Sequence, residues 1–362
     1  MVRGTARLPR DLHPVAWWAW ALGLAVAASS TTNPLVLLMV VGVAATAVAL
    51  RRSDQPWADS FRLYVVLGVV IVVVRVAFRL LLGTGVPGTV LIALPEIQLP
   101  EFAAGIVLLG PITRESLLAG LYDGLRLAAI VISVGAANAL ANPKRLLRSV
   151  PPALYEVGTA LVVAVTMLPQ FADSARRVRA AQSLRGGDTG RVRGLRRFLV
   201  PVLEDALERS LAMAAGMDAR GYGRAGSAGR VQRTRTGALM LLGLMGVCVG
   251  TYAVLDPTAP RWLALPMLLG GLAVACLGLV SAGSRVQRTR YRPDRWQWPE
   301  LVVVAGGLVA AYAGWRVAHD RLTLAYPPLD AVPQVSALTL VALALALGAA
   351  LCAPDQRRAV GA

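Results

Sequence analysis

The sequence predicts an all-α integral membrane protein with about eight transmembrane helices. Of the 362 residues, 56% are hydrophobic and only 16% are charged, whereas soluble domains contain roughly 25% charged residues. Several apolar runs approach the roughly 20 residues with which an α-helix spans a bilayer. These runs are too long and too continuous for the alternating pattern of outer-membrane barrel strands. Helices, and not a barrel, are therefore expected to cross the membrane.

Eight apolar runs have the length and composition of spanning helices. They cover residues 15–30, 34–50, 61–82, 116–141, 237–255, 262–281, 300–318 and 335–352. The basic residues between them predict the orientation, because Arg-rich loops mark the cytoplasmic side of a membrane protein. Arg3, Arg7 and Arg10 place the N-terminus in the cytoplasm, and Arg357 and Arg358 place the C-terminus there. The net charge of +17 is explained in this way, and no nucleic-acid partner is expected.

One further apolar run, residues 153–168, does not fit the pattern of a crossing helix. It contains Glu156, ends at Pro169 and is shorter than the usual spanning length. If it crossed, the Arg-rich stretch 173–236 would lie outside the cell, against the orientation rule. We therefore expect a buried or interfacial helix that does not cross.

This interpretation divides the chain into three parts. Residues 1–142 form an N-terminal transmembrane half with about four spans, and residues 237–362 form a C-terminal half with about four more. Between the fourth and fifth spans lies an insertion, residues 143–236, which we expect to be cytoplasmic or interfacial. The insertion holds the candidate functional residues.

An amphipathic helix of about 20 residues is predicted after Pro201, a residue that the first helical turn tolerates. Its apolar positions recur at helical spacing and include Leu203, Leu207, Leu211 and Ala214. On its polar side, Asp205 and Arg209 are placed to form an i,i+4 ion pair.

Two helix ends in the insertion carry an arginine followed by a glycine. One is Ala219-Arg220-Gly221, and the other is Leu184-Arg185-Gly186. Glycine just past the last turn is the usual helix cap, and arginine there benefits from the helix dipole. An exposed guanidinium at such an end can also form a bidentate pair with carboxylates in a groove of a partner. Capping alone explains one copy, but two copies in one cytoplasmic insertion favour docking.

The sequence contains no signature of catalysis, phosphate binding or metal binding. It has no CxxC, HExxH, GxSxG or GxxxxGK[ST] pattern. Cys248, Cys276 and Cys352 lie inside apolar runs, where buried hydrophobic roles are expected. We therefore expect a non-catalytic subunit with no bound metal, and any ATP that it uses must be hydrolysed by another chain.

Three arginines fall within the predicted spans: Arg75, Arg79 and Arg126. Charges inside a membrane are costly and are often functional. Here structural roles are favoured, because Arg79 is near a helix end and Arg126 has Asp123 within one turn.

The chain resembles the transmembrane T component of energy-coupling factor (ECF) transporters, which includes the cobalt-transport protein CbiQ. That family is marked by Ala-Arg-Gly motifs at the ends of two cytoplasmic coupling helices. Ala219-Arg220-Gly221 matches this motif fully, whereas Leu184-Arg185-Gly186 departs from it at the alanine. Further similarity lies in Gly120-Leu121-Tyr122-Asp123-Gly124-Leu125-Arg126-Leu127 and in Asn142-Pro143-Lys144-Arg145-Leu146-Leu147.

The resemblance implies a coupling subunit of an ATP-driven importer in the bacterial plasma membrane. Its partners would be two ATP-binding-cassette (ABC) ATPases, which bind the ATP, and a separate substrate-binding S component for a vitamin or a metal ion such as cobalt. Arg185 and Arg220 would lie in the ATPase grooves. Leu203, Leu207, Leu211 and Ala214 would pack against the other coupling helix or contact the S component. The substrate itself is not encoded in this chain.

Three alternatives lead to different observations. A secondary transporter would have broken helices with matched polar sites in two halves. An integral-membrane enzyme would need acids, His or Cys gathered at one membrane depth. A membrane anchor that docks a cytoplasmic protein would use the same two arginines without coupling them to ATPases.

Overall fold

The computed structural model describes residues 12–53, 59–81, 88–93, 95, 97–98, 107–149, 154–184, 191–221, 230–256, 260–283 and 296–354. Helices dominate this part of the chain, and the strands have two or three residues each. The chain divides into two compact units, one formed by residues 1–146 with 294–362 and the other by residues 147–293. An all-α membrane protein was expected, and this architecture confirms it.

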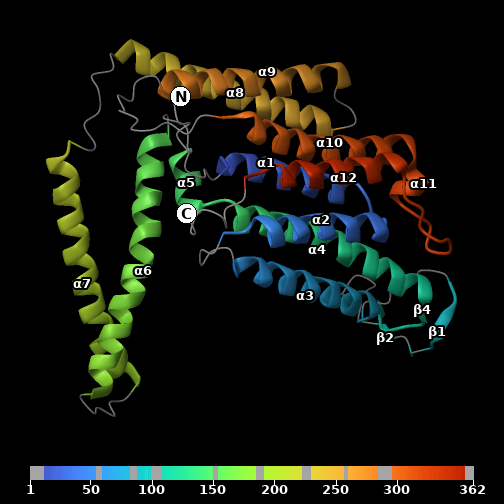
Figure 1. Ribbon diagram of the computed structural model, residues 1–362, viewed down its shortest axis with the longest axis horizontal. Helices are drawn as coiled ribbons and strands as arrows, with labels where there is room; N and C mark the ends of the chain where they lie inside the picture. Colours follow the sequence, from blue (N-terminus) through green and yellow to red (C-terminus); the bar gives the residue numbers. More distant parts are fainter. Residues whose placement is uncertain are drawn as a thin grey trace, which may run out of the picture. The chain divides into compact units, whose positions relative to one another are not determined.

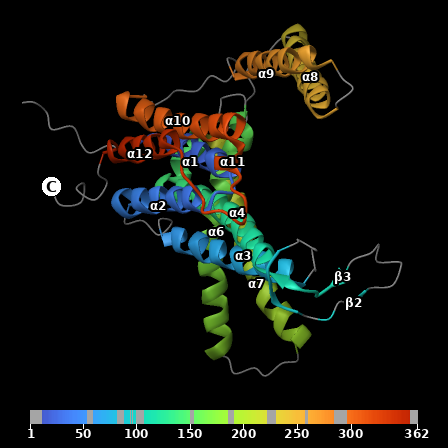
Figure 2. The same cartoon turned by 90° about the vertical axis from the view of Figure 1, so that its right-hand side faces the viewer.

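The first unit combines the two ends of the chain. Its helices are α1 (Pro14–Ser29), α2 (Pro34–Arg51), α3 (Ser60–Leu81), α4 (Arg114–Leu140), α10 (Trp298–Asp320), α11 (Leu322–Ala325) and α12 (Ala337–Leu351). Between α3 and α4, β1 (Val90–Ile92) pairs antiparallel with β4 (Ile112–Thr113), and β2 (Ile97–Gln98) with β3 (Val107–Leu108). Helix α3 lies beside α4, α1 packs on α4 and α10, and α10 lies beside α12 (Figures 1 and 2).

Among its described residues, the second unit contains four long helices. They are α6 (Tyr155–Leu184), α7 (Arg191–Ala219), α8 (Arg230–Leu255) and α9 (Arg261–Gly283), and the short α5 (Pro143–Arg148) contains the boundary between the units. These units reflect packing, and the predicted division into transmembrane halves and a cytoplasmic insertion stays a prediction. Helices α10 to α12 pack with the N-terminal helices, whereas α8 and α9 pack on each other.

Tryptophans and glycines build the centre of the first unit. Trp17 and Trp20 of α1 are almost fully buried, and the indole nitrogen of Trp20 donates a hydrogen bond to the Ala346 carbonyl of α12 at 3.0 Å. Gly23 of α1 faces Gly307 of α10 so closely that a Cβ on Gly23 would lie 2.1 Å from the Gly307 oxygen. Small residues allow membrane helices to approach at this distance and to gain dispersion contacts.

The turn between α1 and α2 is anchored by polar contacts with the C-terminal segment. The Asn33 side chain is fully buried, and its amide nitrogen donates to the carbonyls of Leu324 at 3.0 Å and Gln334 at 2.6 Å. The Thr31 hydroxyl donates to the Ala325 carbonyl at 2.6 Å. These bonds satisfy buried polar groups that would otherwise destabilise the turn.

A glycine seam also joins α8 to α9. A Cβ on Gly246 would lie 2.8 Å from the Gly271 Cα, and one on Gly243 would lie 2.5 Å from the Ala275 nitrogen. The two backbones therefore touch along this seam, as small residues permit in membrane hairpins. The large apolar side chains of both helices, such as Leu241 and Leu269, remain exposed.

Seven helices of the described residues are long and apolar enough to cross a membrane. Six of them correspond to predicted spans, namely α2, α3, α4, α8, α9 and α10. The other two predicted spans are the apolar helices α1 and α12, which have 16 and 15 residues.

The seventh, Val157–Leu184, was not predicted as a span. We expected a helix that ends at Pro169. Instead, α6 continues through this proline to Leu184 and has 30 residues in all. A similar correction applies to Pro201, which lies inside α7 and not in its first turn. In both cases the helix continues beyond a proline that lacks the backbone N–H donor.

Two further expectations about single residues were wrong. Arg126 does not pair with Asp123 among the described residues but donates to the Ser29 carbonyl, which links α4 to α1. Cys248, Cys276 and Cys352 are free but exposed at the helix surface, whereas burial was predicted. Arg75 and Arg79 lie against α4, where Gly124 and Gly120 leave room for the stems of their side chains.

The close contact between α1 and α10 predicts a strong effect of a single methyl group. In Gly307→Ala, the added Cβ would lie 2.5 Å from the Trp20 Cα, so the helices must separate at a cost of about 1–3 kcal/mol. We expect a lower melting temperature in detergent. In the control Gly42→Ala, the Cβ meets nothing within 4 Å, and the melting temperature should stay the same or rise. Equal effects of the two changes would contradict this account of the packing.

Candidate functional site

Helix α7 ends at Ala219, and Arg220 and the predicted cap residue Gly221 follow it directly. Gly221 has φ of 74°, a left-handed conformation that glycine adopts without steric strain. The last turn is closed by hydrogen bonds from the Arg220 nitrogen to the Met217 carbonyl at 3.2 Å and from the Gly221 nitrogen to the Asp218 carbonyl at 2.8 Å. The chain therefore leaves the helix at Arg220 and Gly221, where the glycine cap was predicted.

The Arg220 side chain is exposed at this helix end. It forms no ion pair within the described part of the chain. Ala219 is exposed as well, and Gly221 is half-buried. A guanidinium in this position keeps its donors available for a partner, and the carbonyl end of the helix favours its positive charge.

The second predicted end is described only up to Leu184, the last residue of α6. Its side chain is 88% exposed, so a large apolar group is exposed immediately before Arg185. Arg185 and Gly186 lie outside the described residues.

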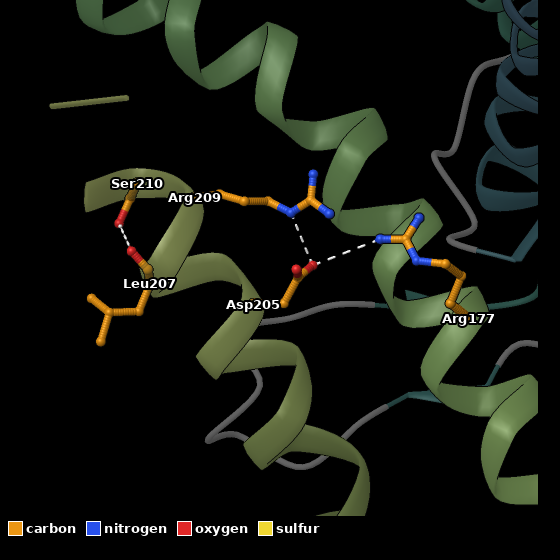
Figure 3. A network of polar contacts seen from close by, with 5 residues as sticks. All are labelled: Arg177, Asp205, Leu207, Arg209 and Ser210. Carbon is orange, nitrogen blue, oxygen red and sulfur yellow. Dashed lines mark hydrogen bonds and ion pairs between the residues drawn. The ribbon is translucent and has the colours of Figure 1, made fainter. Parts of the chain in front are cut away.

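Helices α6 and α7 contact each other through a polar network around Asp205 (Figure 3). The Asp205 carboxylate accepts a hydrogen bond from Arg209 Nε of the same helix at 3.0 Å, and Arg177 Nη2 of α6 lies 3.7 Å from it. Ser174, a buried residue of α6, is also close enough to this carboxylate to influence its pKa. Asp205 thus joins two helices that are adjacent in sequence.

The same contacts lower the pKa of Asp205. The Ser174 hydroxyl is the largest cause, followed by the hydrogen bond from Arg209 and the positive charges of Arg209 and Arg177. Each of them stabilises the ionised carboxylate. The Asp205–Arg209 pair was predicted from sequence, whereas the contacts with α6 were not, because residue spacing within one helix cannot identify partners on another.

The apolar stripe of α7 does not face α6. Leu203, Leu207 and Leu211 are between 61% and 63% exposed, and Ala214 is exposed too. The residues on the side of Asp205, such as Ala206 and Met213, are half-buried. Of the two predicted roles for the stripe, packing against the other coupling helix is therefore not observed, and contact with another component stays a prediction.

No group of three His, Cys, Asp or Glu residues in the described ranges is arranged to hold a metal ion. The candidate site is therefore a surface built from an exposed arginine, a glycine cap and an apolar stripe on one long helix. Such a surface can bind another protein.

Together, the fold and this surface define a multi-pass membrane protein with an amphipathic helical hairpin between its hydrophobic segments. The family model of the cobalt transport protein CbiQ matches residues 5–231. The chain therefore belongs to this family, which comprises the T components of ECF transporters, and is a transport component. The matched region includes α1 to α7, so it contains both predicted coupling segments. No curated protein matches the chain.

The Asp205 network predicts a pH-dependent contact between α6 and α7. Because the folded-state pKa of Asp205 is lowered, its contribution is present above the unfolded pKa and is lost as the pH falls through the folded pKa. Asp205→Asn should therefore accelerate amide hydrogen exchange in α6 and α7 at neutral pH, and acidification should reduce the difference from the wild type.

The control is Glu208→Gln on the same helix. Glu208 is exposed and has no ion pair among the described residues, so this change should leave the exchange rates unaltered. Equal acceleration in both variants would show that the general loss of acidic charge, and not the Asp205 network, controls the hairpin.

Proposed function

We propose that this protein is the transmembrane coupling subunit of an ATP-driven ECF-type importer. The observation that carries the proposal is the exposed Arg220 at the glycine-capped end of α7, inside the region that matches the family model. Partner ATPases bind and hydrolyse the ATP, and this chain transmits their motion without catalysis of its own. The transported substrate is a metal ion or a vitamin, selected by a separate S component.

The protein lies in the bacterial plasma membrane, and the charges of α6 and α7 support a position of both helices on its cytoplasmic side. The second half of α6 contains Asp173, Arg176, Arg177 and Arg179, and α7 also contains charged residues along its length. Although Val157–Leu184 is long enough to span, the arginines of this hairpin belong on the cytoplasmic side by the orientation rule. The two termini lie on the same side in this topology.

Two surfaces of α7 perform two functions in this proposal. Arg220 binds a carboxylate-lined groove of one ATPase, where a planar and permanently charged donor gives a specific contact. Arg185 performs the same role toward a second ATPase. The stripe of Leu203, Leu207, Leu211 and Ala214 contacts the S component, because exposed leucines on a polar helix are best covered by another apolar surface.

A charge reversal at the helix end tests the docking role. Arg220→Glu should abolish co-purification of the ATPases from mild detergent, since it places a carboxylate against an acidic groove. The control Arg197→Glu reverses an exposed arginine near the start of the same helix and should retain the ATPases. Membrane insertion should be normal in both variants. ATPases that still co-purify with the Arg220 variant would refute docking through this residue.

A polar substitution in the stripe tests whether the two surfaces of α7 bind different partners. Leu207→Gln should weaken the retention of the S component by about tenfold, since a buried leucine side chain contributes roughly 1.5–3 kcal/mol. ATPase retention should stay unchanged. The control Glu204→Gln alters a neighbouring exposed position outside the stripe and should affect neither partner. Joint loss of both partners in the Leu207 variant would indicate a damaged helix and contradict separate contact surfaces.

A further inference from the structure

A pocket of about 240 Å³ lies where α10 ends and α12 begins. It is lined by Arg316, Val317, Asp320, Arg321, Ser336, Ala337 and Leu338. All of these residues follow residue 231, so the pocket lies outside the region that matches the family model. The proposed coupling surface on α7 does not include any of them.

The pocket combines two arginines with the start of a helix. Ser336 precedes the first turn of α12, and Ala337 and Leu338 are the first two residues of this 15-residue helix. The first backbone N–H groups of a helix lack partners within the helix and carry a partial positive charge. Together with the guanidinium groups of Arg316 and Arg321, they form an environment that favours an anion.

The hydroxyl of Ser336 is a further, independent donor at the pocket. The Ser336 residue is only 8% exposed and lines the pocket. Its side chain does not cap α12, and no partner for it occurs in the described part of the chain. A hydroxyl that lines the pocket and has no protein partner can donate a hydrogen bond to an oxyanion bound there.

One residue of the pocket opposes anion binding. The Asp320 carboxylate forms an ion pair with Arg316, whose Nε lies 3.0 Å from it. Both side chains of this pair are nearly half-exposed, so the pair is a weak surface contact. The other nitrogens of Arg316 and the whole Arg321 guanidinium remain positive groups at the pocket.

Exposed aromatic residues beside this pocket are typical of the depth of lipid headgroups. Trp315 precedes Arg316, and its ring lies 6.2 Å from Tyr312 and 4.4 Å from His319. Trp315, Tyr312 and the nearby Tyr326 are all more than 40% exposed. Tryptophan and tyrosine gather where a membrane meets water, and the end of the spanning helix α10 is such a place.

We propose that this pocket binds a phosphate group, supplied by the headgroup of an anionic phospholipid. Arg316, Arg321 and the first N–H groups of α12 bind the phosphate oxygens, and Ser336 donates its hydroxyl proton. The acyl chains of the lipid lie along the exposed apolar surface of α10, which includes Leu308 and Val309. The lipid thereby ties the end of α10 to the start of α12.

The test is a titration of the purified full-length protein with dioleoylphosphatidylglycerol, followed by native mass spectrometry. Arg321→Gln combined with Ser336→Ala should reduce the affinity for this lipid about tenfold, through the loss of charge-assisted hydrogen bonds. The control Arg62→Gln removes an exposed arginine of α3 that does not line the pocket and should bind as the wild type does. Equal binding by all three proteins would overturn the proposal.

A second variant is expected to gain affinity for the lipid, a result that misfolding cannot produce. Asp320→Asn removes the carboxylate that competes for Arg316, so it should bind the same lipid severalfold more tightly. Unchanged or weaker binding in this variant would contradict the assigned role of Arg316.

Inorganic phosphate distinguishes the source of the anion. Phosphatidylglycerol should raise the melting temperature of the wild type, whereas millimolar inorganic phosphate should not. If both raise it equally, and both effects vanish in the double variant, then the pocket binds a soluble anion and the assignment to a lipid is overturned.

Discussion

The close approach of α1 and α10 is the contact on which the first unit depends. Gly23 and Gly307 bring the two backbones together, and this proximity lets Trp20 reach the Ala346 carbonyl of α12. Helices from the two ends of the sequence thereby share one core, in which Leu24, Leu37 and Val303 are also fully buried. The residues between them, including α6 to α9, are a long insertion between helices that pack together in one unit.

The packing of helices from distant parts of the sequence also explains the polar contacts at the helix ends. A membrane interior offers no water to satisfy backbone carbonyls or buried side chains. The buried amide of Asn33 therefore bonds to carbonyls near α11, and Arg126 bonds to the carbonyl that ends α1. Each of these bonds connects distant parts of the sequence, so they stabilise the arrangement of helices as well as the groups themselves.

Most of the helices could be predicted because apolar length alone identifies them. The runs at 34–50 and 61–82 correspond almost residue for residue to α2 and α3. The helices with interior prolines were predicted less well, because local rules treat Pro169 and Pro201 as boundaries, whereas long helices can accommodate them. The membership of α10 and α12 in the N-terminal unit could not be predicted, since it rests on contacts between Gly23 and Gly307 that have no periodic signal.

In the candidate site, too, features with a local sequence signal could be predicted and long-range contacts could not. The Arg220-Gly221 end was predictable, because a glycine that must adopt positive φ leaves a local signature in the sequence. The direction of the apolar stripe was not, because helical spacing identifies a face without stating what covers it. In the structure Asp205, and not the leucines, is directed toward α6.

The separation of polar and apolar faces on α7 has a mechanical consequence. A contact through Asp205, Arg177 and Ser174 is directional, so it fixes the rotation of α7 about its own axis more firmly than a smooth apolar contact would. With the rotation fixed, the leucine stripe faces away from α6, and Arg220 is held at the end of the same rigid helix. Under the proposed coupling function, a displacement of Arg220 would move the stripe with it.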